Sequence, residues 1–194
     1  MERKPRIGVL ALQGAVSPHR AHVEAAGAEF VEVRDEKVLA SVDGLILPGG
    51  ESTTMLKLLK AFDMEDALGD YGRAKPVWGI CAGAILAAKT VHHPDQRSFG
   101  WIDVDVTRNG YGRQLDSFQA ELLGDEVSFI RAPILERVGP DVEVLAAYEG
   151  QPVYVRSGHV FLSTFHPELS LRAPSRFHRD FVDEVRLSGL RKPV

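Results

Sequence analysis

The sequence is poor in three features that mark particular classes of protein. It has one cysteine, Cys81, so no disulfide can form within the chain. No stretch approaches the roughly 20 consecutive apolar residues that a membrane-spanning helix needs. The net charge of -4 gives no broad basic surface for nucleic acid. We therefore expect a cytoplasmic protein that binds neither nucleic acid nor a membrane.

The first apolar stretch follows basic residues and superficially resembles a signal peptide. It is short, however, and Gln13 and Gly14 interrupt it, so we interpret it as a buried strand. Similar apolar runs bounded by glycine and proline follow, each with a stretch that can be helical after it: RIGVLAL, EFVEVR, GLILPGG and KPVWGI. Runs that are apolar at successive positions are typical of strands buried on both faces of a parallel sheet.

The later apolar runs have little helical sequence between them, which predicts antiparallel strands added to the parallel sheet. These runs are FGWIDVDVTR, VSFIRAP, VEVLAAY, PVYVRSG and VFLSTFHP. No linker rich in proline, glycine or serine divides the chain. The sequence therefore predicts one α/β domain over residues 1–194, with a mostly parallel central sheet flanked by helices.

Two helices can be predicted from apolar residues at helical spacing. One covers residues 53–68, with Ser52 or Thr53 as its N-cap. The other runs from about Pro174 to Leu187, and we expect its apolar stripe to dock on the sheet. That stripe consists of Phe177, Phe181, Val182 and Val185.

The segment KPVWGICAGAILAAK has the pattern of a nucleophile elbow, in which a strand turns sharply into a helix. Gly79 and Gly83 permit the turn, which would project Cys81 beside the helix N-terminus. Helix-end amides favour the thiolate, which is the reactive form of cysteine. An unpaired cysteine is most often only a small buried hydrophobe, but this context favours a nucleophile.

A thiolate nucleophile needs a base that later protonates the leaving amine, and the base must be oriented. His166 and Glu168 in STFHPELS offer both groups. In an extended backbone, residues two apart point to the same side, and Pro167 restricts the backbone between them. Glu168 would then bind one imidazole nitrogen and leave the other facing Cys81.

The segment GLILPGGESTTM ends a strand in adjacent glycines. Such glycines let the backbone approach a ligand and direct an N–H at developing negative charge. The segment lacks the GK[ST] ending of a phosphate-binding loop. On its own it would indicate only a strand-to-helix turn.

Taken together, several segments resemble the glutaminase subunit of pyridoxal 5'-phosphate synthase, in that family's order and nearly at its spacing. They are LALQGAV, LPGGESTTM, GICAGAILAAK, RNGYGRQLDSFQAEL, FIRAP and STFHPEL. GICAG and HPE alone would indicate only the wider class I glutamine amidotransferases, whose fold is flavodoxin-like. The resemblance runs from Ile7 to the C-terminal helix.

The resemblance implies a cysteine hydrolase that releases ammonia from glutamine through a glutamyl thioester, without a cofactor or a metal. Cys81 would be the nucleophile, His166 the proton carrier and Glu168 its support. Gly50 and Ala82 would donate the oxyanion hydrogen bonds. The family's substrate contacts match Gly50, Glu51, Ser52, Arg108, Ile130 and Arg131.

The resemblance also implies a partner, because the ammonia must reach a synthase subunit in a hetero-oligomer that makes vitamin B6. In the family this partner activates the glutaminase, partly by ordering the segment that here contains Gln13. We therefore expect weak activity from the isolated chain. The sequence departs from the family pattern at Trp78, Ile80 and Gly110, where phenylalanine, threonine and serine are usual.

Two alternatives stay open from the sequence. One is a stand-alone cysteine hydrolase of the γ-glutamyl hydrolase or DJ-1-like kind. The segments HPE and PGGES argue against the DJ-1-like kind. The other is a catalytically silent interaction subunit with the same fold. Two further pairs lack a complete ligand set, so we expect a loop at His92 and His93 and the polar face of a strand at Asp103 and Asp105.

Overall fold

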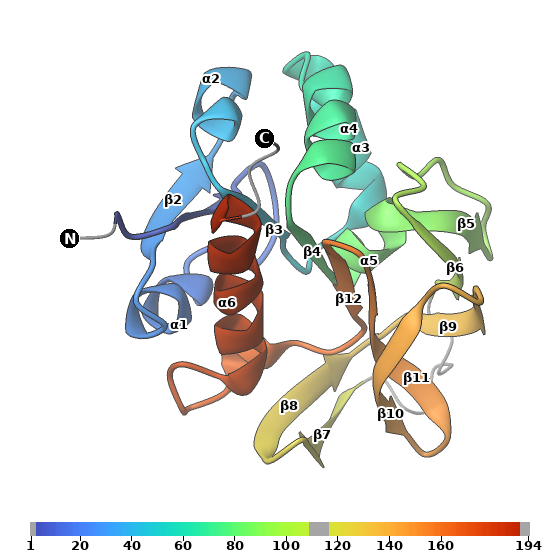
Figure 1. Cartoon of the computed structure of the whole chain (residues 1–194). Coiled ribbons are helices and arrows are strands. Elements are labelled where there is room, and N and C mark those ends of the chain that lie inside the picture. The colour runs from blue at the N-terminus through green and yellow to red at the C-terminus, as the bar shows by residue number, and fades with distance from the viewer. Residues whose placement is uncertain (1–2, 109–116, 191–194) are drawn as a thin grey trace.

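The computed structural model describes residues 3–108 and 117–190, and a twisted sheet forms its centre (Figure 1). The strands of this sheet are β1 (Arg6–Leu10), β2 (Glu29–Val33), β3 (Gly44–Leu47), β4 (Val77–Ile80), β10 (Glu143–Tyr148), β11 (Gln151–Ser157) and β12 (Val160–Ser163). They lie in the order β10-β11-β12-β4-β3-β1-β2. All neighbours from β12 to β2 pair in parallel, whereas β10 and β11 pair antiparallel. The prediction of a mostly parallel sheet with added antiparallel strands is confirmed.

The innermost strands are buried along their whole length, which explains their uninterrupted apolar sequences. Every residue of β3, β4 and β12 is buried. One face of the sheet is covered by α1 (His19–Ala25) and α6 (Arg176–Leu190). The other face is covered by α2 (Glu36–Ala40), α3 (Ser52–Ala61), α4 (Glu65–Ala74) and α5 (Ala82–Ala87). Helices therefore lie on both sides, as expected of parallel strands.

Helix α6 docks on the sheet through the stripe that the sequence indicates. Phe177, Phe181, Val182 and Val185 are all buried in the core cluster that contains Trp78 of β4. The helix begins at Arg176, slightly later than the predicted start. The docking prediction is confirmed.

The single helix predicted over residues 53–68 is wrong. The chain forms α3 and α4 instead, separated at Phe62–Met64, where Asp63 has a φ of +53°. That left-handed residue ends the helical path. The predicted cap is also wrong, because Glu51 is the N-cap and its side chain accepts hydrogen bonds from the backbone N–H groups of Thr53 and Thr54.

Two smaller sheets lie beside the main one, and the sequence did not separate them. The first contains β5 (Ala88–His92), β6 (Ile102–Thr107) and β9 (Ile134–Val138). The second is the hairpin of β7 (Ser117–Leu122) and β8 (Asp125–Ile130). As expected, Asp103 and Asp105 lie on the less buried face of β6, where both pair with Arg137. No helix in the two described ranges has the length and apolar character that crossing a bilayer requires.

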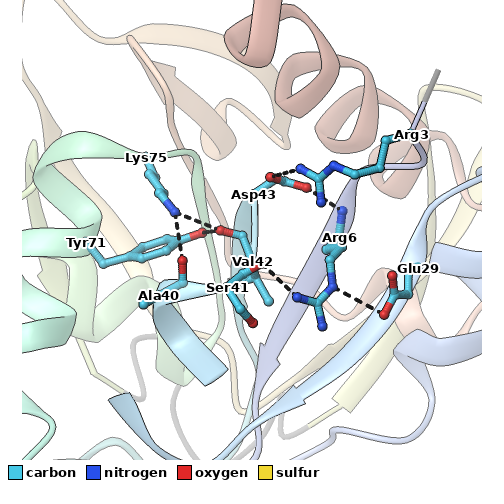
Figure 2. Close-up of polar contacts among 9 residues, drawn as sticks. All are labelled: Arg3, Arg6, Glu29, Ala40, Ser41, Val42, Asp43, Tyr71 and Lys75. Atoms are coloured by element: carbon cyan, nitrogen blue, oxygen red, sulfur yellow. Dashed lines mark hydrogen bonds and ion pairs between the residues drawn. The ribbon is translucent and has the colours of Figure 1, made fainter. Parts of the chain in front are cut away.

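Cationic side chains hold the turn between α2 and β3 at the amino ends of the strands (Figure 2). The Lys75 ammonium donates to the carbonyl oxygens of Val42 at 2.9 Å and Ala40 at 3.4 Å. Arg6 donates to the carbonyl of Ser41 at 2.9 Å. The last carbonyls of a helix have no intrahelical partner and carry partial negative charge, so these cations satisfy them.

Replacing Lys75 with methionine keeps the aliphatic stem and removes these donors. We expect Lys75→Met to lower the free energy of unfolding by about 1 kcal/mol, the typical net loss for one hydrogen bond, because the Val42 carbonyl keeps the Tyr71 hydroxyl as a donor. Equilibrium denaturation measures it. The matched control is Arg73→Met, two residues earlier in α4, whose ion pair with Asp70 is exposed and should contribute less than about 0.5 kcal/mol. Equal losses in both variants would contradict the capping role.

Candidate active site

A cavity of about 420 Å³ lies where β1, β3, β4 and β12 end at their carboxyl sides. Open parallel sheets characteristically bind ligands at this edge. The described residues that line it include ten positions singled out from the sequence: Gln13, Gly50, Glu51, Ser52, Cys81, Ala82, Arg108, Ile130, Arg131 and His166. The structure therefore brings segments from across the whole chain to one cleft.

Cys81 occupies a sharp turn between β4 and α5. Its backbone has φ +50° and ψ -102°, a conformation that residues with a side chain rarely adopt. The side chain is largely buried but reaches the cavity, and its Sγ lies 3.9 Å from the carbonyl oxygen of Ile130. This is the strained strand-to-helix corner that the sequence pattern predicts.

The two glycines of the elbow are required by close backbone contacts. A Cβ at Gly79 would lie 2.5 Å from the carbonyl oxygen of Gly83, and one at Gly83 would lie 2.1 Å from that of Leu47. Real Cβ atoms do not approach oxygen so closely, so any side chain at either position would push the corner apart. The departures Trp78 and Ile80 are fully buried beside it, and the Trp78 indole donates to the Ser163 hydroxyl at 3.1 Å.

His166 reaches the same corner from β12, the strand that pairs with β4. Its backbone N–H donates to the carbonyl of Ser128 at 2.7 Å, which ties it to the small hairpin. The ring lines the cavity beside Cys81, whose side chain acts to raise the imidazole pKa. The parallel pairing of β12 with β4 therefore sets the imidazole beside the sulfur.

Glu168 supports His166, but by a different backbone path from the one expected. Its carboxylate oxygen Oε1 lies 2.7 Å from His166 Nδ1. The extended backbone expected between them is wrong, because Pro167–Leu169 form a one-turn 3-10 helix, η1. This turn brings the carboxylate back to the Nδ1 side of the ring. Glu168 is 3% exposed there and does not line the cavity.

These contacts favour a charged imidazole. Burial acts to lower the pKa of His166, but its hydrogen bonds with Cys81 and Glu168 outweigh burial and raise the pKa to about 10. Burial likewise acts to raise the pKa of Glu168, but the hydrogen bond from His166 brings it below its usual value. The site can therefore hold an imidazolium between the Cys81 sulfur and the Glu168 carboxylate.

The loop after β3 covers the His166 ring. A Cβ at Gly49 would lie 2.2 Å from Cε1 of His166, so only glycine lets the loop pack there. The loop is tied to the segment after β1, because Ala15 N–H donates to the Gly49 carbonyl at 2.9 Å and Glu51 N–H donates to Gln13 Oε1 at 2.8 Å. Gln13 thus contacts the loop rather than the sulfur.

Charged groups close one side of the cavity. Arg108 donates to Glu51 Oε1 at 3.2 Å, and the Arg108 side chain is 15% exposed. Burial acts to raise the pKa of Glu51, but hydrogen bonds from Thr53 and Thr54 lower it to about 2, so this carboxylate stays charged. Gly110, the third departure from the family pattern, lies outside the described residues.

Several residues around the site carry no sequence signal of their own. Gln96 accepts a hydrogen bond from the Ser52 hydroxyl at 2.9 Å and so anchors the loop. Three histidines, His19, His22 and His178, are buried behind Glu168. They come from helices far apart in the chain, and periodicity could only assign them to helix interiors.

Comparison with known proteins gives one family and many full-length relatives. Residues 9–187 match the SNO glutamine amidotransferase family. The chain is 48% identical over 192 residues to a pyridoxal 5'-phosphate synthase subunit PdxT of Solibacter usitatus, covering 93% of this chain and 99% of the relative. It is 49% identical over 191 residues to the subunit of the same name in Mycobacteroides abscessus, covering 94% and 98%.

Solved structures agree on the fold. One described as a glutamine amidotransferase has a TM-score of 0.85 at 41% identity, covering 93% of this chain and 98% of that one. Another, described as PurLQS from Thermotoga maritima, has a TM-score of 0.56 at 20% identity, covering 97% and 98%. The second likeness shows only the fold.

The raised pKa of His166 can be tested directly by a pH titration of its ring proton resonances. We expect a midpoint near 10, and we expect Cys81→Ala to lower it because that variant removes a hydrogen-bond partner of the charged ring. Because the folded pKa exceeds the unfolded value of 6.5, the stability that this proton contributes is complete below pH 6.5 and is lost as pH rises through about 10. A midpoint at or below 6.5 in the unsubstituted chain would contradict the arrangement.

Proposed function

Because the chain belongs to the SNO glutamine amidotransferase family, we propose that it hydrolyses L-glutamine to L-glutamate and ammonia for pyridoxal 5'-phosphate synthesis. The observation that carries this proposal is the meeting of the chain's single cysteine with a carboxylate-supported imidazole at one cavity. Residues 1–194 act as one glutaminase domain in this proposal, and they act in the cytosol, where a lone thiol stays reduced.

The reaction follows from the charges at the elbow. The Cys81 thiolate attacks the carboxamide carbon, and the His166 imidazolium gives its proton to the departing nitrogen, so ammonia leaves and a glutamyl thioester forms. His166, now neutral, takes a proton from water as the water attacks the thioester. Glutamate is released, and the proton returns the site to its starting state. Glu168 orients the ring throughout.

Negative charge that develops on the carboxamide oxygen needs donors. We assign this role to the backbone N–H groups of Gly50 and Ala82. Ala82 directly follows the nucleophile, which is the position that supplies one donor in comparable elbows. Gly50 lines the same cavity from the loop that covers His166.

The remaining cavity residues hold the substrate in this proposal. Glu51, Ser52, Arg108, Ile130 and Arg131 all line the space beside Cys81. The planar guanidinium of Arg108 suits the α-carboxylate of glutamine, and Glu51 fixes its position. The Ile130 carbonyl lies 3.9 Å from Sγ, so it would contact a substrate bound at the nucleophile.

The ammonia serves a synthase subunit, which docks on the face that carries the cavity. Hydrogen bonds join the 49–51 loop to Gln13 and Ala15, so a partner that binds residues 13–15 can also affect the oxyanion region. A partner that orders residues 13–15 would order Gly50 with them. We therefore expect weak glutaminase activity from the isolated chain and higher activity in the complex.

The decisive experiment is co-purification with a candidate synthase subunit, followed by an ammonia assay with and without that subunit. We expect glutamine-dependent ammonia release that rises in the complex and is abolished by Cys81→Ala, because no other thiol is present. A glutamine-analogue alkylator should label only the unsubstituted chain. Unchanged ammonia release by the Cys81→Ala complex would favour a silent interaction subunit, and hydrolysis of another amide without glutamine turnover would favour a stand-alone hydrolase.

The assignment of Arg108 predicts a selective effect on substrate affinity. We expect Arg108→Gln to raise the KM for glutamine about tenfold or more, as loss of a hydrogen bond to a charged group does, while kcat changes little. Steady-state kinetics of the complex measures both constants. The control is Arg97→Gln, whose ion pair with Glu65 lies outside the cavity lining. A fall in kcat at unchanged KM would contradict a substrate-binding role.

A further inference from the structure

Behind Glu168 lies a cluster of buried histidines that the proposed reaction does not use. His19 is 0% exposed, His178 1% and His22 3%. His19 and His22 belong to α1, and His178 belongs to α6. Burial of so many ionisable rings is costly unless their polar atoms are hydrogen-bonded. The hydrogen-bond partners of each ring therefore show which groups the cluster acts on.

The rings form a directed chain of hydrogen bonds. Ser175 Oγ lies 2.7 Å from His178 Nδ1, and His178 Nε2 lies 2.9 Å from His19 Nδ1. Ser175 Oγ also accepts from the backbone N–H of His178 at 3.3 Å, which leaves the hydroxyl proton free to donate to Nδ1. With the hydroxyl as donor, His178 would donate from Nε2 to His19 Nδ1, which would leave the His19 proton on Nε2.

The chain ends on two unsatisfied atoms. His19 Nε2 and Glu168 Oε2 are both buried, and neither has a hydrogen-bond partner among the described residues. The two side chains also interact electrostatically. The other carboxylate oxygen of Glu168, Oε1, already binds His166. A donor and an acceptor, each unpaired, thus belong to neighbouring groups behind the proposed nucleophile.

The charge state of His19 agrees with this direction. Burial lowers its pKa to about 4, although the charge of Glu168 acts to raise it, so the ring is neutral at pH 7 and has one N–H. The reverse tautomer would place a lone pair of Nε2 towards a carboxylate. The ionisable groups that act on His19 are Glu168, His22, His166 and, through the hydrogen bond, His178.

We propose that His19 is a positioning residue for the reaction, whose Nε2–H binds Glu168 Oε2 through one water. Glu168 is then held between two imidazoles, one on each oxygen, and Ser175 and His178 fix the tautomer of His19. This inference rests on the proposed glutaminase function, because it assigns a support to the carboxylate of that site.

The consequence is a fixed carboxylate plane. A carboxylate bound through one oxygen can rotate about its own bond, whereas one bound through both oxygens holds the His166 ring in one orientation. His22 anchors the same region, because its Nδ1 accepts the backbone N–H of Ser175 at 3.0 Å and its ring stacks on His178 at 4.5 Å. His19 therefore acts on the rate of proton transfer and not on substrate binding.

The test compares His19→Phe, which removes the donor, with His19→Gln, which keeps an N–H near the position of Nε2. In the reconstituted complex we expect His19→Phe to lower kcat about tenfold or more, as loss of an outer hydrogen-bond partner does, with KM within about twofold. The acid limb of its kcat profile should move to higher pH, because Glu168 without the second donor retains a proton at higher pH. His19→Gln should recover most of kcat.

The matched control is Tyr154→Phe. Its hydroxyl is also buried without a partner among the described residues, and its ring packs on Phe177 of α6. This variant perturbs the same helix without touching the carboxylate, so we expect kcat and the acid limb to match the parent. Glutamine turnover by the parent complex tests the proposed function separately. If the parent is active but His19→Phe matches it, or if His19→Gln is no better than His19→Phe, the inference is overturned.

A second measurement needs neither activity nor a substitution. A long-range proton–nitrogen correlation spectrum of the full-length chain reports which nitrogen of a histidine carries the proton. We expect His19 protonated on Nε2, with Nδ1 as an acceptor, at pH 7. Protonation on Nδ1 would reverse the chain of hydrogen bonds and overturn the inference, whatever the variants do.

Discussion

The site depends on the turn at Cys81, where the chain passes from strand to helix through a positive φ. Such a conformation costs free energy for a residue with a side chain, on the order of 1–3 kcal/mol. It is held because Gly79 and Gly83 pack against neighbouring backbone at distances that no Cβ allows. The hydrogen bond from Cys81 N–H to the Ser163 carbonyl, 2.8 Å long, fixes the corner to β12. The buried thiol is thereby placed at the edge of the cavity, beside a charged ring.

The same strand pairing brings the second half of the site into place. Strands β12 and β4 lie side by side (Figure 1). In their parallel register Ser163 lies opposite Ile80, so the chain continues from these paired residues to His166 and to Cys81 at the same edge. Cys81 and His166 are 85 positions apart in the sequence, and they meet because the strands that precede them are neighbours in the sheet. The 3-10 turn that follows then brings Glu168 beneath the ring. The pairing of β12 with β4 thus sets the position of the site, and short turns place its side chains.

The parts that could be predicted from sequence are those whose signal is local. Buried parallel strands show as uninterrupted apolar runs, and the elbow shows as small residues around Cys81 at a strand-to-helix boundary. What failed depended on single backbone angles. Asp63, with its positive φ, divides one apparent helix into two. Glu51 takes the cap because its backbone is extended and its carboxylate accepts from the N–H groups of Thr53 and Thr54. The separate small sheets were also missed, since which strands pair is decided by tertiary packing.

The histidines behind Glu168 show the limit of sequence reasoning most clearly. His19 lies in α1 and His178 in α6, and their rings meet only because both helices cover the same face of the sheet. In a mainly apolar core, apolar side chains of similar size could fill the space that His19 and His178 occupy. A row of paired polar groups that ends on the carboxylate of the site is therefore better explained by what it does to that carboxylate than by packing. The buried core on this face and the cavity are then two sides of one hydrogen-bonded arrangement, with Glu168 between them.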